Sequence, residues 1–262
     1  IKQGAGALSL AGANTYSGDT IIERGTLALR GGASLRSDVL IAPQVGNPNA
    51  AALQFMNGTT RVTGNVDNGA SVILRSDNID AAIEGNYLQR PGAQLVVALG
   101  ANALMVTGTA TLAGTVRVDS VIAGYVPRDG RTQPLLHADG GVTGSFDSVT
   151  NGLAPGSLLQ ASLLHASNDV TMVIDRVSVT SASLQAGLGG TALASAARVE
   201  SAFEVLDRNG AALDGFADAA GQLQQVDGAN ALQASLDSLS GKAHALATAA
   251  TFDSIDMNRR AL

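Results

Sequence analysis

The stretch Gly92-Ala93-Gln94-Leu95-Val96-Val97-Ala98-Leu99 decides the fold class, because it joins a turn residue to a short run of apolar and β-branched side chains. Short runs of this kind between turn residues indicate β-strands. Gly suits the corners between strands because it adopts positive φ without steric cost. The same order, a Gly, a small or polar residue and then a strand, recurs at Gly25-Thr26-Leu27, Gly69-Ala70-Ser71-Val72 and Gly108-Thr109-Ala110-Thr111-Leu112.

This recurrence favours a solenoid, in which each coil buries its inner side chains against the neighbouring coils. A sandwich or a barrel also fits short strands separated by about ten residues, and the irregular period leaves that alternative open. We predict that the residues before about 176 form stacked rungs around one apolar interior.

The composition agrees with a narrow interior and excludes several functions. The chain is 45% hydrophobic but only 3% aromatic, so Ala, Val, Leu and Ile provide the core. Its net charge is -6, and its 16 Lys and Arg residues are scattered, whereas binding to nucleic acid requires clustered cations. The absence of Cys excludes disulfides, thiolate catalysis and cysteine-ligated zinc.

After Arg176 a helical period replaces the strand pattern, so the chain as a whole is predicted to be mainly β with an α-helical C-terminal part. We expect amphipathic helices over 192–209, 213–226 and from Asn230 to about Met257. No apolar run reaches the length of about 18 residues that predicts a transmembrane helix. Because the chain begins in mid-pattern without Met, we expect it to be a fragment.

The opening, Gly4-Ala5-Gly6-Ala7-Leu8-Ser9-Leu10-Ala11-Gly12-Ala13-Asn14-Thr15-Tyr16-Ser17-Gly18-Asp19-Thr20, resembles the passenger-associated repeat of type V autotransporters. The strand phrase that follows this repeat in the family stands here as Ile22-Glu23-Arg24-Gly25-Thr26-Leu27. Several fixed positions therefore occur in the family's order.

Two later regions extend the resemblance. The phrases Tyr87-Leu88-Gln89, Leu112-Ala113-Gly114-Thr115-Val116 and 140–146 are similar to the autochaperone region of autotransporter passengers. The stretch 231–244 is similar to the phrase before the translocator barrel, except that Lys242 replaces an acidic residue.

The resemblance implies a right-handed parallel β-helix followed by helices. It assigns residues 1–85 to the rungs of a passenger stalk, 86–176 to an autochaperone-like cap and 177–262 to a helical linker. The linker would lead to an outer-membrane β-barrel beyond Leu262. Its predicted linker-helix residues are Leu232, Leu236, Leu239, His244 and Leu246. His244 is expected either on the helix surface or at a polar contact with the barrel.

The function that follows is a non-catalytic stalk and autochaperone that supports translocation and folding of an upstream effector. The implied partners are the chain's own barrel translocator, the upstream passenger domain and the outer-membrane assembly machinery, and the implied location is the outer membrane, the cell surface or the medium. A subtilisin-like serine protease is one upstream domain of such virulence proteins. The alternative is an adhesin stalk that binds a host surface ligand. The predicted folding core comprises Leu95, Val97, Leu99, Leu104, Val106, Leu112, Val116, Val118 and Phe146.

Chemistry-bearing residues are sparse. His137 and His165 each follow a Leu-Leu pair, which predicts strand ends near a shared turn. They could form a metal or acid/base pair, but a metal site needs three or more ligands, and we expect surface or edge histidines. The Asn/Asp phrases at 65–69 and 77–80 match no calcium-loop pattern and are expected to serve turn geometry. We predict no catalytic, cofactor or metal residues.

Overall fold

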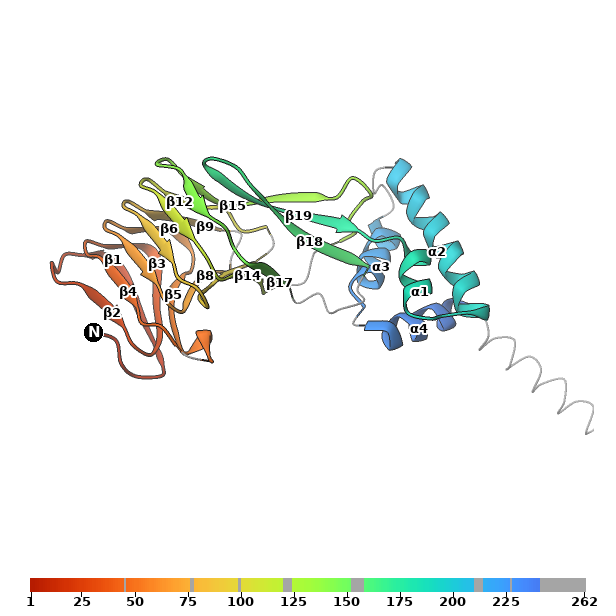
Figure 1. The fold of residues 1–262 in the computed structure, drawn as a ribbon, viewed down its shortest axis with the longest axis horizontal. Helices are drawn as coiled ribbons and strands as arrows, with labels where there is room; N and C mark the ends of the chain where they lie inside the picture. Colours follow the sequence, from red (N-terminus) through yellow and green to blue (C-terminus); the bar gives the residue numbers. More distant parts are fainter. Residues whose placement is uncertain are drawn as a thin grey trace, which may run out of the picture. The chain divides into compact units, whose positions relative to one another are not determined.

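A computed structural model describes residues 1–44, 46–75, 78–98, 100–119, 124–151, 158–209, 214–226 and 228–240. The chain forms two compact units (Figure 1). The solenoid unit contains Ile1–Val121, Arg131–Gly152 and Ala161–Ile174, and the helical unit contains Ile122–Gly130, Leu153–Gln160 and Asp175–Leu262. Among the residues that the structure describes, 43% lie in strands, which form a solenoid of about 5 turns, and four helices follow in the C-terminal part.

The strands of successive coils pair in parallel and form three columns. Within a column the strands lie side by side, as Figure 1 shows. The first column is β2 (Thr20–Ile22), β4 (Val39–Ile41), β7 (Val66–Asn68), β10 (Tyr87–Gln89), β13 (Ala110–Leu112) and β16 (Val142–Gly144). The second is β5 (Ala51–Phe55), β8 (Ser71–Leu74), β11 (Gln94–Val97), β14 (Thr115–Val118) and β17 (Ser148–Asn151). The third is β6 (Gly58–Val62), β9 (Ile79–Ile83), β12 (Leu104–Val106) and β15 (Arg131–Ala138).

One long strand, β3 (Gly25–Leu35), begins both the second and the third column. Its first half pairs with β5 and its last residues pair with β6, all in parallel, while β1 (Ala7–Asn14) pairs along its other edge. The predicted stacking of rungs is confirmed, and the alternatives of a sandwich or closed barrel are wrong.

The interior consists of ladders of apolar side chains, one from each coil. Strand register aligns Leu27, Leu53, Val72, Leu95 and Val116 in sequence, and each is at most 2% exposed. Burying one such side chain contributes about 1.5–3 kcal/mol. The stacked ladders therefore account for the stability of a core that holds few aromatic rings.

A column of glycines lets the coils approach closely at one corner. Gly64, Gly85, Gly108 and Gly140 follow one another up the stack, and the amide nitrogen of Gly108 donates to the carbonyl oxygen of Gly85 at 2.9 Å. A Cβ atom on Gly85 would collide with the carbonyl of Gly64, and one on Gly140 would lie 2.7 Å from the Gly108 carbonyl carbon. Glycine is required here for space.

The end of the stack differs from the predicted rungs. β15 pairs in parallel with β12 on one edge but antiparallel with β19 (Asp169–Arg176) on the other, and β18 (Leu159–His165) lies beside β19. The prediction of parallel rungs up to about residue 176 is therefore wrong for β18 and β19. An antiparallel pair closes with a short turn, whereas a parallel one needs a long crossover. The hairpin also covers the open edge of β15.

The helical unit contains α1 (Val179–Gln185), α2 (Gly190–Asn209), α3 (Asp214–Gln224) and α4 (Gly228–Leu239). α2 and α3 lie where the apolar period predicts them. α4 begins near the predicted Asn230, and the rest of that predicted helix, 241–257, lies outside the described residues. α1 is not predicted; the Ser178 hydroxyl caps it by accepting from the amide of Ser181 at 3.3 Å.

These helices share one apolar core, and none of the described helices is long and apolar enough to cross a membrane. The two other segments of the helical unit contribute Tyr125 and Leu158 to this core. Its other buried members are Val179, Ala192, Ala196, Phe203, Leu206, Ala217, Ala220, Leu232 and Leu236.

Candidate folding site in the last coils

The residues predicted to form the folding core lie inside the solenoid unit, except Leu99, which lies outside the described residues. Leu95 pairs with Val116, and Val97 pairs with Val118, across β11 and β14. Leu104 pairs with Leu136, one coil further on. All the described members are at most 5% exposed: Leu95, Val97, Leu104, Val106, Leu112, Val116, Val118 and Phe146.

A buried polar network lies among these apolar ladders. The hydroxyl of Tyr87 donates to Oε1 of Gln89 at 2.7 Å, and Nδ2 of Asn68 donates to the Tyr87 oxygen at 3.2 Å. All three side chains are at most 1% exposed. Burial raises the pKa of the Tyr87 phenol well above its usual range, so the hydroxyl stays protonated and able to donate.

The network satisfies backbone groups from several coils. Nε2 of Gln89 donates to the carbonyls of Ala113 and Thr115, at 2.9 and 3.1 Å, in the next coil. Nδ2 of Asn68 donates to the carbonyl of Gln94 at 3.1 Å. Unpaired backbone carbonyls in an apolar interior would cost free energy. The side chains of β7 and β10 thus join three successive coils at this corner.

A second set of polar side chains joins the coils along an exposed corner. Asp38 Oδ1 accepts from the amide of Asn65 at 2.7 Å, Asn65 Oδ1 from the amide of Asn86 at 2.9 Å, and Asn86 Oδ1 from the amide of Thr109 at 2.9 Å. Each bond reaches exactly one coil further. Asn65 therefore has the expected structural role at a turn.

The outer face of the second column is covered as well. Ala52, Ile73 and Val96 form an apolar cluster on the side away from the interior, at 1%, 8% and 1% exposure. Beside it, in the short 3-10 helix η1 (Pro48–Ala50), Oδ1 of Asn49 accepts from Nε2 of Gln94 at 2.7 Å and from Arg117 at 3.1 Å. β8 and β11 are buried on both faces for this reason, which their uninterrupted apolar runs could have indicated.

The two histidines of the solenoid unit lie near strand ends, and each has a different neighbour. His137 Nδ1 lies 2.7 Å from Asp169 Oδ1, its register partner on β19, and Nε2 lies 3.2 Å from Asp139 Oδ1. The hydrogen bond with Asp169 is the main cause that raises the His137 pKa. The ring of His165 lies 6.1 Å from that of Phe146.

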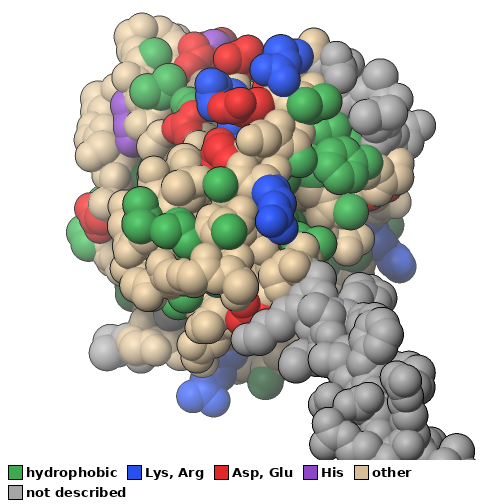
Figure 2. Space-filling model, turned by 90° about the vertical axis from the view of Figure 1, so that its right-hand side faces the viewer, with side chains coloured by type: hydrophobic (Ala, Val, Ile, Leu, Met, Phe, Trp, Pro, Cys, Tyr) green, Lys and Arg blue, Asp and Glu red, His purple; other side chains and the backbone are tan. Residues whose placement is uncertain are grey.

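These contacts do not form a metal site. In the described part of the chain, no group of three or more His, Cys, Asp or Glu could hold a metal ion. His244 lies outside the described residues. On the face drawn in Figure 2, acidic and basic side chains are interspersed with apolar ones, without the basic stripe of a phosphate-binding surface.

The helical unit has a charged centre that sequence analysis missed. The Arg176 side chain is 2% exposed and forms ion pairs of 3.0 Å with Glu200 and with Asp207 on α2. Its guanidinium lies 5.3 Å from the ring centroid of Phe203, which also meets the ring of Tyr125 edge-on at 5.2 Å. No local pattern in the sequence indicates this arrangement, because Arg176 is the last residue of β19 and its partners on α2 lie 24 and 31 residues further along the chain.

Gln224 on α3 fastens the two other segments of the helical unit to the helices. The Gln224 side chain donates to the carbonyl of Val126 and accepts from its amide, both at 2.8 Å, and the Gln224 carbonyl accepts from the amide of Leu158 at 3.0 Å.

Among the predicted linker residues, Leu232 and Leu236 lie in the core, Leu239 is 56% exposed and Leu246 lies outside the described residues.

The opening repeat has a physical account in the first coil. The Gly6 carbonyl accepts from the amide of Thr26 at 3.3 Å, and a Cβ atom on Gly25 would collide with the carbonyls of Gly4 and Gly6. The Asn14 side chain donates to the Ser34 carbonyl at 3.2 Å. The repeated glycines and Asn thus fix the contact between β1 and β3.

Comparison with known proteins agrees with this geometry. No curated protein matches the chain. Residues 1–29, which include β1, β2 and the start of β3, match the family model of the Passenger-associated-transport-repeat. This match and the β-solenoid together support an autotransporter passenger region.

Proposed function

We propose that this chain is the stalk of an autotransporter passenger and that its last coils, within residues 86–176, begin the folding of the stalk outside the cell. The observation that carries the proposal is the uninterrupted parallel ladder from β3 to β14, in which the strands of each coil pair only with strands of the neighbouring coils. Such a stack can grow one coil at a time.

The antiparallel hairpin supports a starting point at the C-terminal end of the stack. β18 and β19 are neighbours in sequence, and the amide of Ala166 donates to the Asp169 carbonyl at 2.8 Å in the turn between them. Closing a short loop costs little entropy. A chain that emerges C-terminus first could therefore form this hairpin without a template, add β15 to β19 and then offer the free edge of β15 to β12.

The remaining parts of the proposal follow from the same role. Residues 1–85 serve as further rungs, and 177–262 serve as the linker to a translocator barrel of the same protein. The outer-membrane assembly machinery would insert that barrel, and an upstream effector domain would be carried to the cell surface. The chain itself acts without catalysis.

The experiment compares two equivalent interior positions at opposite ends of one ladder. Leu53 and Val116 are both fully buried, but Leu53 lies in an early coil and Val116 in a late one. The chain is displayed ahead of an outer-membrane barrel, with Leu53→Asp or Val116→Asp, and whole cells are treated with protease. We expect Val116→Asp to reduce the protease-resistant surface product strongly, and Leu53→Asp to leave a resistant fragment from the later coils.

The control uses neighbouring residues of β12 that face opposite ways. Val106 is 1% exposed and Met105 is 39% exposed. Met105→Asp should display like the parent, while Val106→Asp should behave like Val116→Asp. Equal loss of display for Leu53→Asp and Val116→Asp would show that the late coils have no special part in folding.

A further inference from the structure

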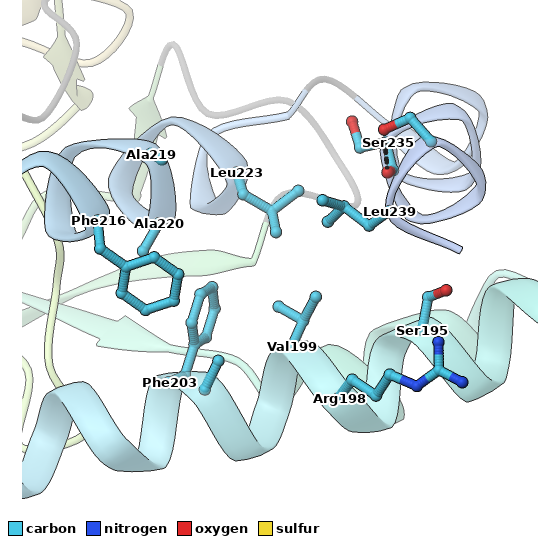
Figure 3. A pocket seen from close by; sticks show the side chains of 12 residues that line it. Ser195, Arg198, Val199, Phe203, Phe216, Ala219, Ala220, Leu223, Ser235 and Leu239 are labelled. Atoms are coloured by element: carbon cyan, nitrogen blue, oxygen red, sulfur yellow. Dashed lines mark hydrogen bonds between the residues drawn. The ribbon is translucent and has the colours of Figure 1, made fainter. Parts of the chain in front are cut away.

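The helical unit contains an apolar groove between α2, α3 and α4 (Figure 3). Its volume is about 420 Å³, within the range of about 300–1,000 Å³ that is usual for binding sites. Val199 and Phe203 from α2, Phe216 and Leu223 from α3, and Leu239 from α4 provide most of its apolar wall.

Two properties indicate that the groove has an occupant. Phe216 is 48% exposed and Leu239 is 56% exposed, so large apolar side chains at the groove face water, which is unfavourable. Ser195 is 1% exposed, and its hydroxyl has no hydrogen-bond partner among the described residues. Figure 3 shows this hydroxyl directed from α2 toward the α4 side of the groove. A buried hydroxyl without a partner is costly.

We propose that the groove binds the chain's own segment 243–257. This segment follows α4 after a short connection, and α4 itself lines the groove with Ser235, Ser238 and Leu239. Its sequence carries Leu246, Phe252, Ile255 and Met257, the side chains that an apolar groove accepts from an amphipathic segment. A groove of this volume holds a few such side chains, so Leu246 and Phe252 serve as the anchors.

Polar groups fit the same occupant. Asp253 and Asp256 lie between the apolar residues of the segment, and the groove is bordered by the exposed Arg198. A backbone carbonyl of the segment supplies the acceptor that the Ser195 hydroxyl needs. The docking does not depend on a role of the chain in secretion.

The test uses the absence of native cysteine, which allows one thiol to report on the groove. Ala219 lines the groove and is exposed. In the full chain with Ala219→Cys, a thiol reagent should label Cys at this position about tenfold more slowly than in the same chain that also carries Leu246→Asp and Phe252→Asp. A factor of ten corresponds to a docking free energy of about 1.4 kcal/mol.

Three comparisons make the test decisive. A Thr248→Asp/Thr251→Asp variant, with polar residues of the same segment changed, should keep most of the protection. A Leu88→Cys thiol on the solenoid unit, where Leu88 is 36% exposed, should label equally in all variants. Equal labelling of Ala219→Cys with and without the two anchors would overturn the proposal. Protection that disappears on dilution would also overturn it, because the occupant would then be a second copy.

Discussion

The hydroxyl of Tyr87 donates a hydrogen bond of 2.7 Å to Oε1 of Gln89, two residues further along the same strand, and both side chains are fully buried in the solenoid interior. Alternation along β10 directs these two residues inward and Leu88 outward. The polar pair thus occupies interior positions that an ordinary core would fill with apolar groups.

Tyr87→Phe should lower the free energy of unfolding by about 1–3 kcal/mol, because it removes the donor to Gln89 and the acceptor for Asn68 while leaving both amides buried. The measurement is the midpoint of urea unfolding, followed by the circular dichroism of the strands. Leu88→Ala on the same strand is the control, and it should change the midpoint little. An equal shift for the two variants would contradict the role of the network.

Gly85→Ala should destabilise the solenoid unit by about 1–3 kcal/mol, the usual cost of overpacking. The new methyl group would collide with the carbonyl of Gly64 in the preceding coil, so the corner would have to open. Gly18→Ala is the matched control, because no atom lies within 4 Å of its added Cβ atom. Thermal unfolding of the two variants should separate them; indistinguishable melting would refute close stacking at this corner.

The closing hairpin should lose stability as the pH rises. The folded state raises the pKa of His137 through its hydrogen bond with Asp169, so the protonated ring is bound better in the folded chain than in the unfolded one. The stabilisation is complete below about pH 6.5, the ordinary His pKa, and is lost as the pH rises through the folded pKa.

The measurement for the hairpin is hydrogen exchange of the Ala138 amide, which donates to the Asn168 carbonyl at 2.8 Å. Its protection, corrected for intrinsic exchange, should fall in the parent as the pH rises above about 6.5, the ordinary His pKa, and stay level in His137→Gln. Added salt should weaken the effect, because Asp139 and Asp169 are more than half exposed. The same pH dependence in His137→Gln would assign it to another group.

Arg176→Ala should destabilise the helical unit by about 3–5 kcal/mol, because it leaves Glu200 and Asp207 without their buried partner. Hydrogen exchange should accelerate in α1 and α2 far more than in the strands of the solenoid unit. Arg208→Ala, which removes an exposed Arg from the same helix as Glu200, should have little effect. Comparable acceleration in both variants would argue against Arg176 as the centre of this unit.

Sequence reasoning found the solenoid because stacking requires the same alternation in every coil, as Leu53, Val72 and Leu95 show. It also found α2 and α3, whose apolar period is local. It missed the antiparallel β19, since a strand of alternating residues such as Val170 and Met172 reads the same in either direction.

The polar contacts were harder to predict for a different reason. Gln89 reaches the backbone of Ala113 and Thr115, and Arg176 reaches Asp207, across separations that no local period encodes. Tyr87 and Gln89 at inward positions were the one available sign that the interior contains more than apolar side chains. Where polar residues occupy every second, inward position of a predicted strand, a buried polar network should be predicted.

The segments that contain Tyr125 and Leu158 belong to the helical unit although strands of the solenoid unit precede and follow each of them along the chain. Proteolytic cleavage after Arg176 would therefore yield two fragments that remain bound to each other through Phe203, Gln224 and their contacts. An expression fragment that stops at residue 176 would leave Tyr125, Val126 and Leu158 without their partners and would tend to aggregate. Dissection of this chain calls for circular permutants or paired fragments, since a single truncation point cannot divide it.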